Sequence, residues 1–192
     1  MAYPTVSAPY GLKPINRIDG MAYAGAIRQI PMASGYTATF FGDTVLIVNG
    51  YINKDTGTTT ATPCGVFVGC TYTNAQGQPV QAQYAPAGQT NMVAYVVDDP
   101  MAAFQVAVVS GTTVIASVSR DVVGSNMALV QNAGNANTGD SGVAVLSSST
   151  ATTNTLPIRV IDVVPATATG TDAYVELIVK INTHQYNNTT GV

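Results

Sequence analysis

Charged residues are scarce in this sequence of 192 residues, and their scarcity limits what the protein can be. They make up only 9% of the chain, with a single glutamate, Glu176. Lys, Arg and Glu usually cover the exposed faces of helices, so their shortage argues against a helical fold. The net charge is only -3 and no stretch concentrates Lys or Arg, so we expect no direct binding to nucleic acid.

Residues that carry catalysis or bind metals are also few. Catalysis requires at least two cooperating groups. Among the carboxylates only Asp98 and Asp99 are adjacent in sequence, and adjacent side chains of an extended chain point to opposite faces. The sequence has no phosphate-binding loop, no paired histidines and no cysteines at metal-ligand spacing. We therefore expect no enzyme activity, no cofactor and no bound metal.

Two loop motifs resemble functional sites in part of their sequence pattern, but each lacks residues that the function requires. Asn135, Asn137 and Asp140 are spaced oxygen donors, but they lack the terminal glutamate and the flanking helices of an EF-hand. Residues 139–142 read GDSG, as around the serine of a chymotrypsin-like protease, whose chemistry requires a histidine base. The single histidine, His184, follows the serine, which is the wrong order, and we expect it on the surface. A turn explains both motifs more simply.

The two cysteines, Cys64 and Cys70, are six residues apart in what the pattern indicates is one strand. That spacing places them on one face, about 20 Å apart along an extended chain. They cannot form a disulfide with each other unless the chain bulges or folds back at Gly65 or Gly69. We expect both to be small, buried apolar residues.

Export and membrane signals are missing as well. No window approaches the length of a membrane span. The opening segment MAYPTVSAPYGLKP has neither the basic nor the apolar region of a signal peptide. We expect a protein that is made and used without export, and no disulfides.

The sequence is rich instead in Thr, Val, Gly, Ala, Asn and Ser, the composition of strands joined by turns. In the stretch 91–109, two continuous apolar runs flank Asp98-Asp99-Pro100, which indicates two strands in the middle of a core with a tight corner between them. Runs of this kind predict an all-β fold, a β-sandwich or small β-barrel of roughly ten short strands. At most one short helix or 3₁₀ turn is expected, within 114–123.

The other strands are predicted from apolar runs that are separated by turn residues. The Asn49-Gly50 dipeptide is a strong hairpin signal, because both residues accept positive φ. The expected strands lie at 24–33, at 36–52 with a break at Gly42-Asp43, and at 65–73, 80–86, 127–132, 143–148, 156–164 and 173–182.

Residues 1–20 contain three prolines and two tyrosines without periodicity. We predict that they form an extended arm outside a β-rich body of 21–192, which has a possible soft subdivision near 98–100. The arm has apolar and aromatic residues, so it should lie against a surface, either a neighbouring subunit or its own sheet. The candidate partner-binding residues are Tyr3, Pro4, Tyr10, Leu12, Pro14 and Ile15.

The composition of the surface favours an assembly. With 46% apolar residues and so little charge, a free monomer would have little protection against association. We infer that much of the outside is contact surface. The alternative is a secreted β-domain that is simply neutral and rich in threonine.

Short segments over nearly the whole chain resemble a known family. They are SAPYGLKPINRIDG, RQIPMASGY, FFGDTV, GVFVGCTYTNAQGQP, QYAPAG, AYVVDDPMAAFQV and VELIVKINTHQY. In these segments the chain resembles virion structural proteins of tailed bacteriophages. It is especially similar to capsid decoration (cement) proteins of short-tailed phages that infect cyanobacteria and other aquatic bacteria.

The resemblance implies a β-rich protein that binds the major capsid protein on the outer surface of the assembled phage head and stabilises the shell. It also implies a virion location, synthesis in the host cytoplasm and a homo-oligomer, with a trimer preferred. Alternatives are another virion component, such as a tail, fibre or minor capsid subunit, and a carbohydrate-binding β-sandwich. The absence of Trp and the dispersed tyrosines count against the last of these.

Overall fold

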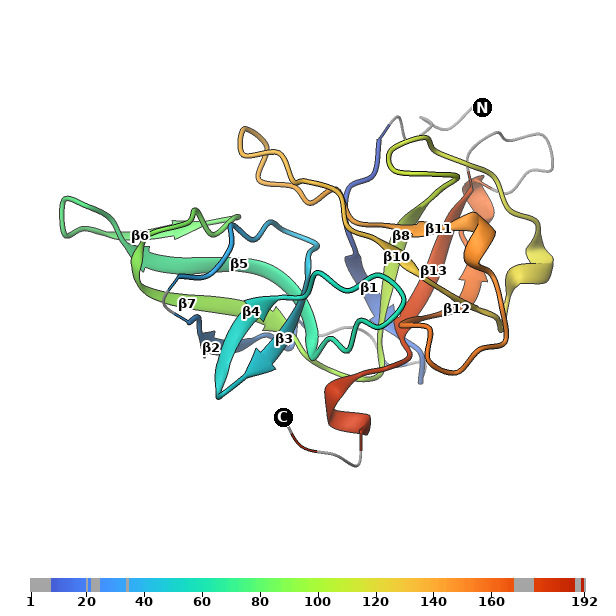
Figure 1. The fold of residues 1–192 in the computed structure, drawn as a ribbon, viewed down its shortest axis with the longest axis horizontal. Coiled ribbons are helices and arrows are strands. Elements are labelled where there is room, and N and C mark those ends of the chain that lie inside the picture. The colour runs from blue at the N-terminus through green and yellow to red at the C-terminus, as the bar shows by residue number, and fades with distance from the viewer. Residues whose placement is uncertain are drawn as a thin grey trace.

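The computed structural model describes residues 8–19, 21, 25–33, 35–167, 175–188 and 191. The described chain is built from strands in two sheets and from short 3₁₀ helices, and it contains no α-helix (Figure 1). The predicted all-β fold class is confirmed. No helix among the described residues is long and apolar enough to cross a bilayer.

The first sheet has six strands, in the order β2-β7-β5-β3-β4, with β6 paired to the free part of β5. Its two outer strands, β2 and β4, approach each other, and Met32 forms a parallel bridge with Ile52, so the sheet is almost closed into a barrel. The interior is filled by large apolar side chains such as Phe67. The strands are β2 (Arg28–Pro31), β3 (Thr44–Val48), β4 (Tyr51–Lys54), β5 (Gly65–Thr73), β6 (Pro79–Ala82) and β7 (Thr90–Val97).

The hairpin predicted from Asn49-Gly50 is confirmed as the connection between β3 and β4. Asn49 has a φ of 50° and Gly50 a φ of 83°, the positive values that a tight two-residue connection requires. The strand expected before Gly42-Asp43 is not formed: residues 36–43 contain only isolated bridges, at Thr39 and Phe41, and β3 begins at Thr44.

The second sheet has seven strands, in the order β10-β11-β8-β13-β12-β9, with β1 also paired to β8. β8 lies in the middle and its side chains are buried along almost its whole length, as the sequence predicted. The strands are β1 (Lys13–Arg17), β8 (Ala102–Val109), β9 (Asn126–Met127), β10 (Leu129–Val130), β11 (Ala144–Leu146), β12 (Ile158–Val163) and β13 (Glu176–Ile181).

β1 corrects the expectation that residues 1–20 stay outside the sheets. It pairs with β8 in antiparallel register from Lys13↔Gln105 to Arg17↔Ala102, with an irregularity after Pro14. Pro14 is tolerated because β1 is an edge strand, where a missing backbone donor leaves no ladder bond broken. β1 covers the first half of one edge of β8, and β11 covers the second half in parallel register.

The 3₁₀ turn expected within 114–123 is present as η1 (Arg120–Val122). Three more 3₁₀ turns were not expected, since each occupies only three residues and leaves no periodic pattern. They are η2 (Ser147–Ser149), η3 (Pro165–Thr167) and η4 (Gln185–Asn187).

The two sheets are connected where β7 leads into β8 through residues 98–101, in the lower part of the view in Figure 1. Phe41, just before β3, exchanges two backbone hydrogen bonds with the segment before β11, at Gly139 (3.0 Å) and Ser141 (2.9 Å). The Leu12 amide donates to the Gly42 carbonyl at 2.9 Å. These backbone contacts fix one sheet against the other.

Candidate contact surface

A buried polar cluster lies at the place where the sheets meet. The Asp43 carboxylate is fully buried and pairs with the Lys54 ammonium at 2.8 Å. It also accepts hydrogen bonds from the Ser141 hydroxyl (2.5 Å) and the Phe40 amide (2.8 Å). Ser141 is the serine of the GDSG motif, and it is itself buried. The motif therefore connects the two sheets, and its serine is engaged with a structural carboxylate.

The adjacent carboxylates Asp98 and Asp99 point to different partners. Asp98 accepts from Arg28 Nε at 2.8 Å and from the Tyr186 hydroxyl at 2.9 Å, and so connects β2 to η4. Asp99 pairs with Arg17 at the end of β1. The pair thus fastens three segments to the connection between the sheets, in keeping with the expectation of a turn role.

His184 is completely buried, so the expectation of a surface histidine was wrong. The polar residues that follow it hold this segment against the first sheet: the side chain of Gln185 binds both the amide (2.8 Å) and the carbonyl (3.2 Å) of Ile47. Nδ1 of His184 accepts from the Tyr186 amide at 3.2 Å, while its Nε2 has no partner. Burial lowers the pKa of His184, and the nearby Asp98 only partly offsets this.

Neither cysteine is a reactive thiol. Cys64 and Cys70 are both free and buried, which confirms the prediction that they act as small apolar residues. Burial raises the pKa of Cys64 to about 12 and that of Cys70 to about 11, so both stay protonated near neutral pH. No group of three or more His, Cys, Asp or Glu residues suited to a metal ion is found among the described residues.

The loop with Asn135, Asn137 and Asp140 is closed by its own hydrogen bonds. The Asn135 amide donates to the Asp140 carbonyl at 2.9 Å, and the Asn135 side chain accepts from the Asn137 amide at 2.9 Å. The Asp140 carboxylate accepts from Gln83 of the first sheet at 3.0 Å. These oxygens thus take part in a turn and in a contact between the two sheets.

The candidate arm residues fall into three groups. Tyr3 and Pro4 lie outside the described residues. Leu12 is fully buried in the core of its own chain, and the Tyr10 hydroxyl donates to Glu176 at 2.5 Å. Pro14 and Ile15, in β1, are partly exposed, as is Tyr10. Of the two arrangements expected for this segment, contact with a neighbouring subunit or with its own sheet, residues 8–19 adopt the second: they pack on the sheet of their own chain.

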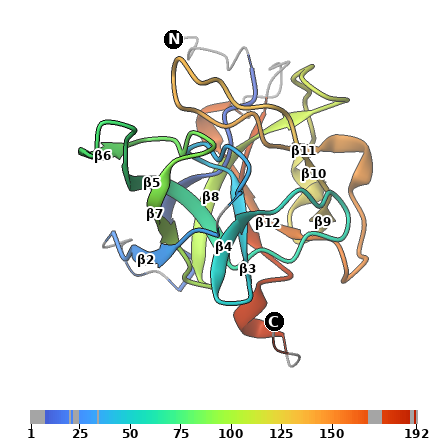
Figure 2. The same ribbon diagram turned by 60° about the vertical axis from the view of Figure 1, so that its left-hand side comes forward.

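Large exposed apolar side chains gather at one end of the first sheet. Val48 and Tyr51 are 40% and 47% exposed and face each other across the tip of the β3–β4 hairpin. Ile27, before β2, and Tyr186, in η4, are also exposed, and Arg28 lies over the Tyr186 ring. The hairpin tip and η4 lie at the lower end of both views (Figure 1 and Figure 2). We name Ile27, Val48, Tyr51 and Tyr186 the hairpin face.

A hollow of about 510 Å³ borders this face where β2 and β4 diverge. Tyr51 belongs to both the hollow and the hairpin face, and the other walls come from the end of β2 and the start of β7. Its lining includes the apolar side chains of Pro31, Met32, Tyr36 and Met92. Together the two features form a largely apolar surface with Arg28 at its edge, which is the kind of surface that marks a protein contact.

Local sequence could have pointed to the hairpin face. Hairpin tips are usually polar, yet the Asn49-Gly50 turn is flanked by Val48 and Tyr51.

Comparisons of this chain with protein families, with curated proteins and with solved structures gave no match.

Proposed function

We propose that this protein is a structural protein that binds another protein through the hairpin face. More particularly, it is a decoration (cement) protein that binds the outer surface of an assembled phage head and stabilises it. The partner is the major capsid protein, and the protein acts as a homo-oligomer, with a trimer preferred. The alternative within the same class is another virion component, such as a tail, fibre or minor capsid subunit.

The observation that carries the proposal is the hairpin face, read together with the sequence resemblance. Two tyrosines and two aliphatic side chains exposed at one end of a weakly charged protein favour contact with a second protein, since aromatic residues are enriched in such interfaces. In a shell, many copies multiply a modest contact into a large total stabilisation.

The internal hydrogen bonds of the protein support the same function. Several of these hydrogen bonds connect segments that are far apart in sequence. They join Ser141 to Asp43, Tyr186 to Asp98, and Gln185 to the backbone of Ile47. A preordered surface loses little conformational entropy when a partner binds to it. A rigid body therefore suits a protein whose role is to hold neighbouring shell subunits in place.

Binding to purified phage heads that lack this protein tests the proposal. We expect the wild-type protein to cosediment with assembled heads and not with unassembled capsid subunits. Replacing both Val48 and Tyr51 by Ser should weaken binding roughly thirtyfold, because truncation of a central aromatic contact costs about 2 kcal/mol or more. The control is Val114→Ser, which changes a valine that is 65% exposed in the loop after β8.

Two outcomes would contradict the proposal at different levels. No binding of the wild-type protein to any form of the head would rule out a decoration protein. Full binding by the Val48/Tyr51 variant would rule out the hairpin face as the contact. A variant that lacks residues 2–7 tests Tyr3 and Pro4 separately, because it keeps Leu12 in the core and β1 on β8.

A further inference from the structure

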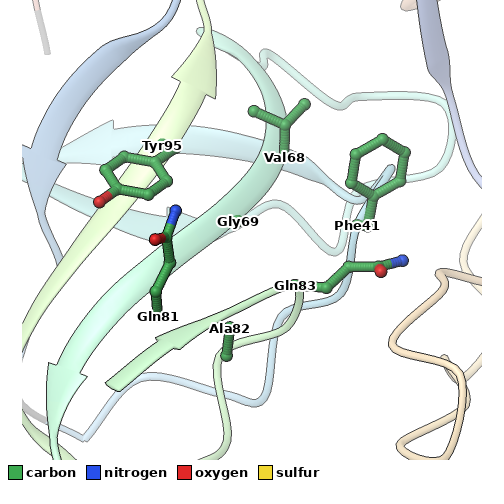
Figure 3. A pocket seen from close by; sticks show the side chains of 7 residues that line it. All are labelled: Phe41, Val68, Gly69, Gln81, Ala82, Gln83 and Tyr95. Carbon is green, nitrogen blue, oxygen red and sulfur yellow. The ribbon is translucent and has the colours of Figure 1, made fainter. Parts of the chain in front are cut away.

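A second hollow, of about 430 Å³, opens on the outer face of the six-stranded sheet (Figure 3). Figure 3 shows Tyr95 and Gln81 on one side, Phe41 and Gln83 on the other, and Gly69 between them. The lining consists of Phe41, Val68, Gly69, Gln81, Ala82, Gln83 and Tyr95. No described residue in this lining carries a charge.

The hollow exists because a glycine takes the place of a side chain. Gly69 of β5 lies directly opposite Tyr95 of β7, at a shift in the register of the two strands. Ala94 and Val96 are buried in the core of the sheet, so the Tyr95 ring between them stands on the outer face. Gly69 has a φ of 147°, and a Cβ there would come within 3.2 Å of the Ala82 carbonyl. The floor of the hollow is therefore the backbone at Gly69, and the Tyr95 ring forms one of its walls.

The groups around this floor offer hydrogen bonds without charge. Each glutamine amide has two donor hydrogens and an acceptor oxygen. Gln83 uses one donor on Asp140 at 3.0 Å, which holds its side chain in place and leaves other positions of the amide for a ligand. Gln81 is exposed at the rim beside the Tyr95 ring (Figure 3).

We propose that this hollow binds a neutral saccharide. A pyranose ring has C–H groups on its faces, which pack on aromatic rings, and hydroxyl groups at its rim, which pair with amides. The volume lies within the range of small-molecule sites, roughly 300–1,000 Å³. The lining itself carries no charge, and the Asp140 carboxylate beside Gln83 would repel an anion.

The saccharide hollow and the hairpin face are separate surfaces. In both ribbon views β6, which carries Gln81, and the tip of the β3–β4 hairpin lie on opposite sides of β5 (Figure 1 and Figure 2). A copy that contacts a partner through the hairpin face can therefore keep the hollow open. The inference does not depend on what that partner is.

Saturation-transfer NMR on the full-length protein tests the inference, with glucose, galactose, mannose and N-acetylglucosamine as probes and glucuronate as the charged comparison. We expect transfer to at least one neutral sugar, and less to glucuronate. Gln81→Ala, at an exposed position, should weaken binding about tenfold, and Tyr95→Ala should abolish the transfer. The matched control is Gln76→Ala, an exposed glutamine in the turn between β5 and β6, which should bind as the wild type does.

Circular dichroism and melting temperature establish that each variant is folded. Because Tyr95 also packs in the sheet, the Gln81 variant decides the question if the Tyr95 variant unfolds. The proposal is overturned if none of the neutral sugars receives transfer, if glucuronate receives as much as the best neutral sugar, or if Gln81→Ala binds like the Gln76 control.

Discussion

Replacing Asp43 by Asn should destabilise the protein strongly. The carboxylate is 0% exposed, and it balances the Lys54 ammonium, whose side chain is only 10% exposed, at 2.8 Å. Removing one partner of a buried ion pair leaves the other charge without compensation, which costs about 3–5 kcal/mol. Asn is similar in size, its single side-chain oxygen can still accept from the Phe40 amide, and its NH2 group can donate to the Ser141 hydroxyl oxygen, so we expect the lower end, about 3 kcal/mol.

Urea unfolding followed by circular dichroism measures this loss, since the chain has no Trp for fluorescence. In thermal unfolding, the same 3 kcal/mol corresponds to a decrease in Tm of about 6–12 °C for a chain of this size. The matched control is Asp162→Asn. Asp162 pairs with Arg120 at 2.9 Å, but the two side chains are 40% and 69% exposed, so that variant should lose less than about 1 kcal/mol.

A second variant separates charge from packing. Lys54→Met alone should also be destabilising, because it leaves the buried Asp43 carboxylate without its cation. The double variant should be more stable than the sum of the two single losses predicts, by about 1–3 kcal/mol. If Asp43→Asn costs no more than Asp162→Asn, or if the two changes at Asp43 and Lys54 are additive, the buried ion pair does not stabilise the protein and the reasoning is refuted.

Two further predictions concern the ends of the chain. Burial holds the pKa of His184 below its ordinary 6.5, so the unfolded chain takes up this proton first as the pH falls. The free energy of unfolding should therefore decrease between about pH 7.5 and about pH 5.5, by at most about 1.4 kcal/mol per pH unit. His184→Gln should flatten that part of the profile, and an unchanged slope would contradict the assignment. In urea unfolding, Gly11→Ala should lower the free energy of unfolding by about 1–3 kcal/mol more than Gly35→Ala does. Both glycines have a φ near 80°, but only a Cβ at Gly11 would come within 2.8 Å of the Gly42 carbonyl. Equal losses would show that close packing at Gly11 is unimportant.

The strands were predictable because their signals are local. The run from Gly65 to Thr73 gave β5 with the observed bounds, and Asn49-Gly50 gave the hairpin, since apolar runs and positive-φ dipeptides act within a few residues. The strand expected at 127–132 is split, however. Met127 pairs with β12 and Leu129 with β11, a division that depends on distant partners.

The positions that the sequence did not reveal are those decided by distant partners. β1 was missed because Pro14 suggests an arm, whereas the free edge of β8, almost ninety residues away in the chain, accepts an edge strand at that place. His184 was expected outside because its neighbours are polar, but Gln185 uses its amide to pair with the backbone of β3. The hollow of Figure 3 depends on Gly69 facing Tyr95, and that register cannot be read from either strand alone.

The central place of β8 has a consequence for how the chain folds as it is made. Two of its three partner strands, β1 and β13, lie far apart in the sequence, and the hydroxyl of Tyr10 meets Glu176 across 166 positions. Pairing between such distant segments folds slowly, because a long loop must close before the contact forms. The second sheet is therefore completed only after β13 has emerged from the ribosome, and a product that terminates before Glu176 leaves one edge of β8 without its partner.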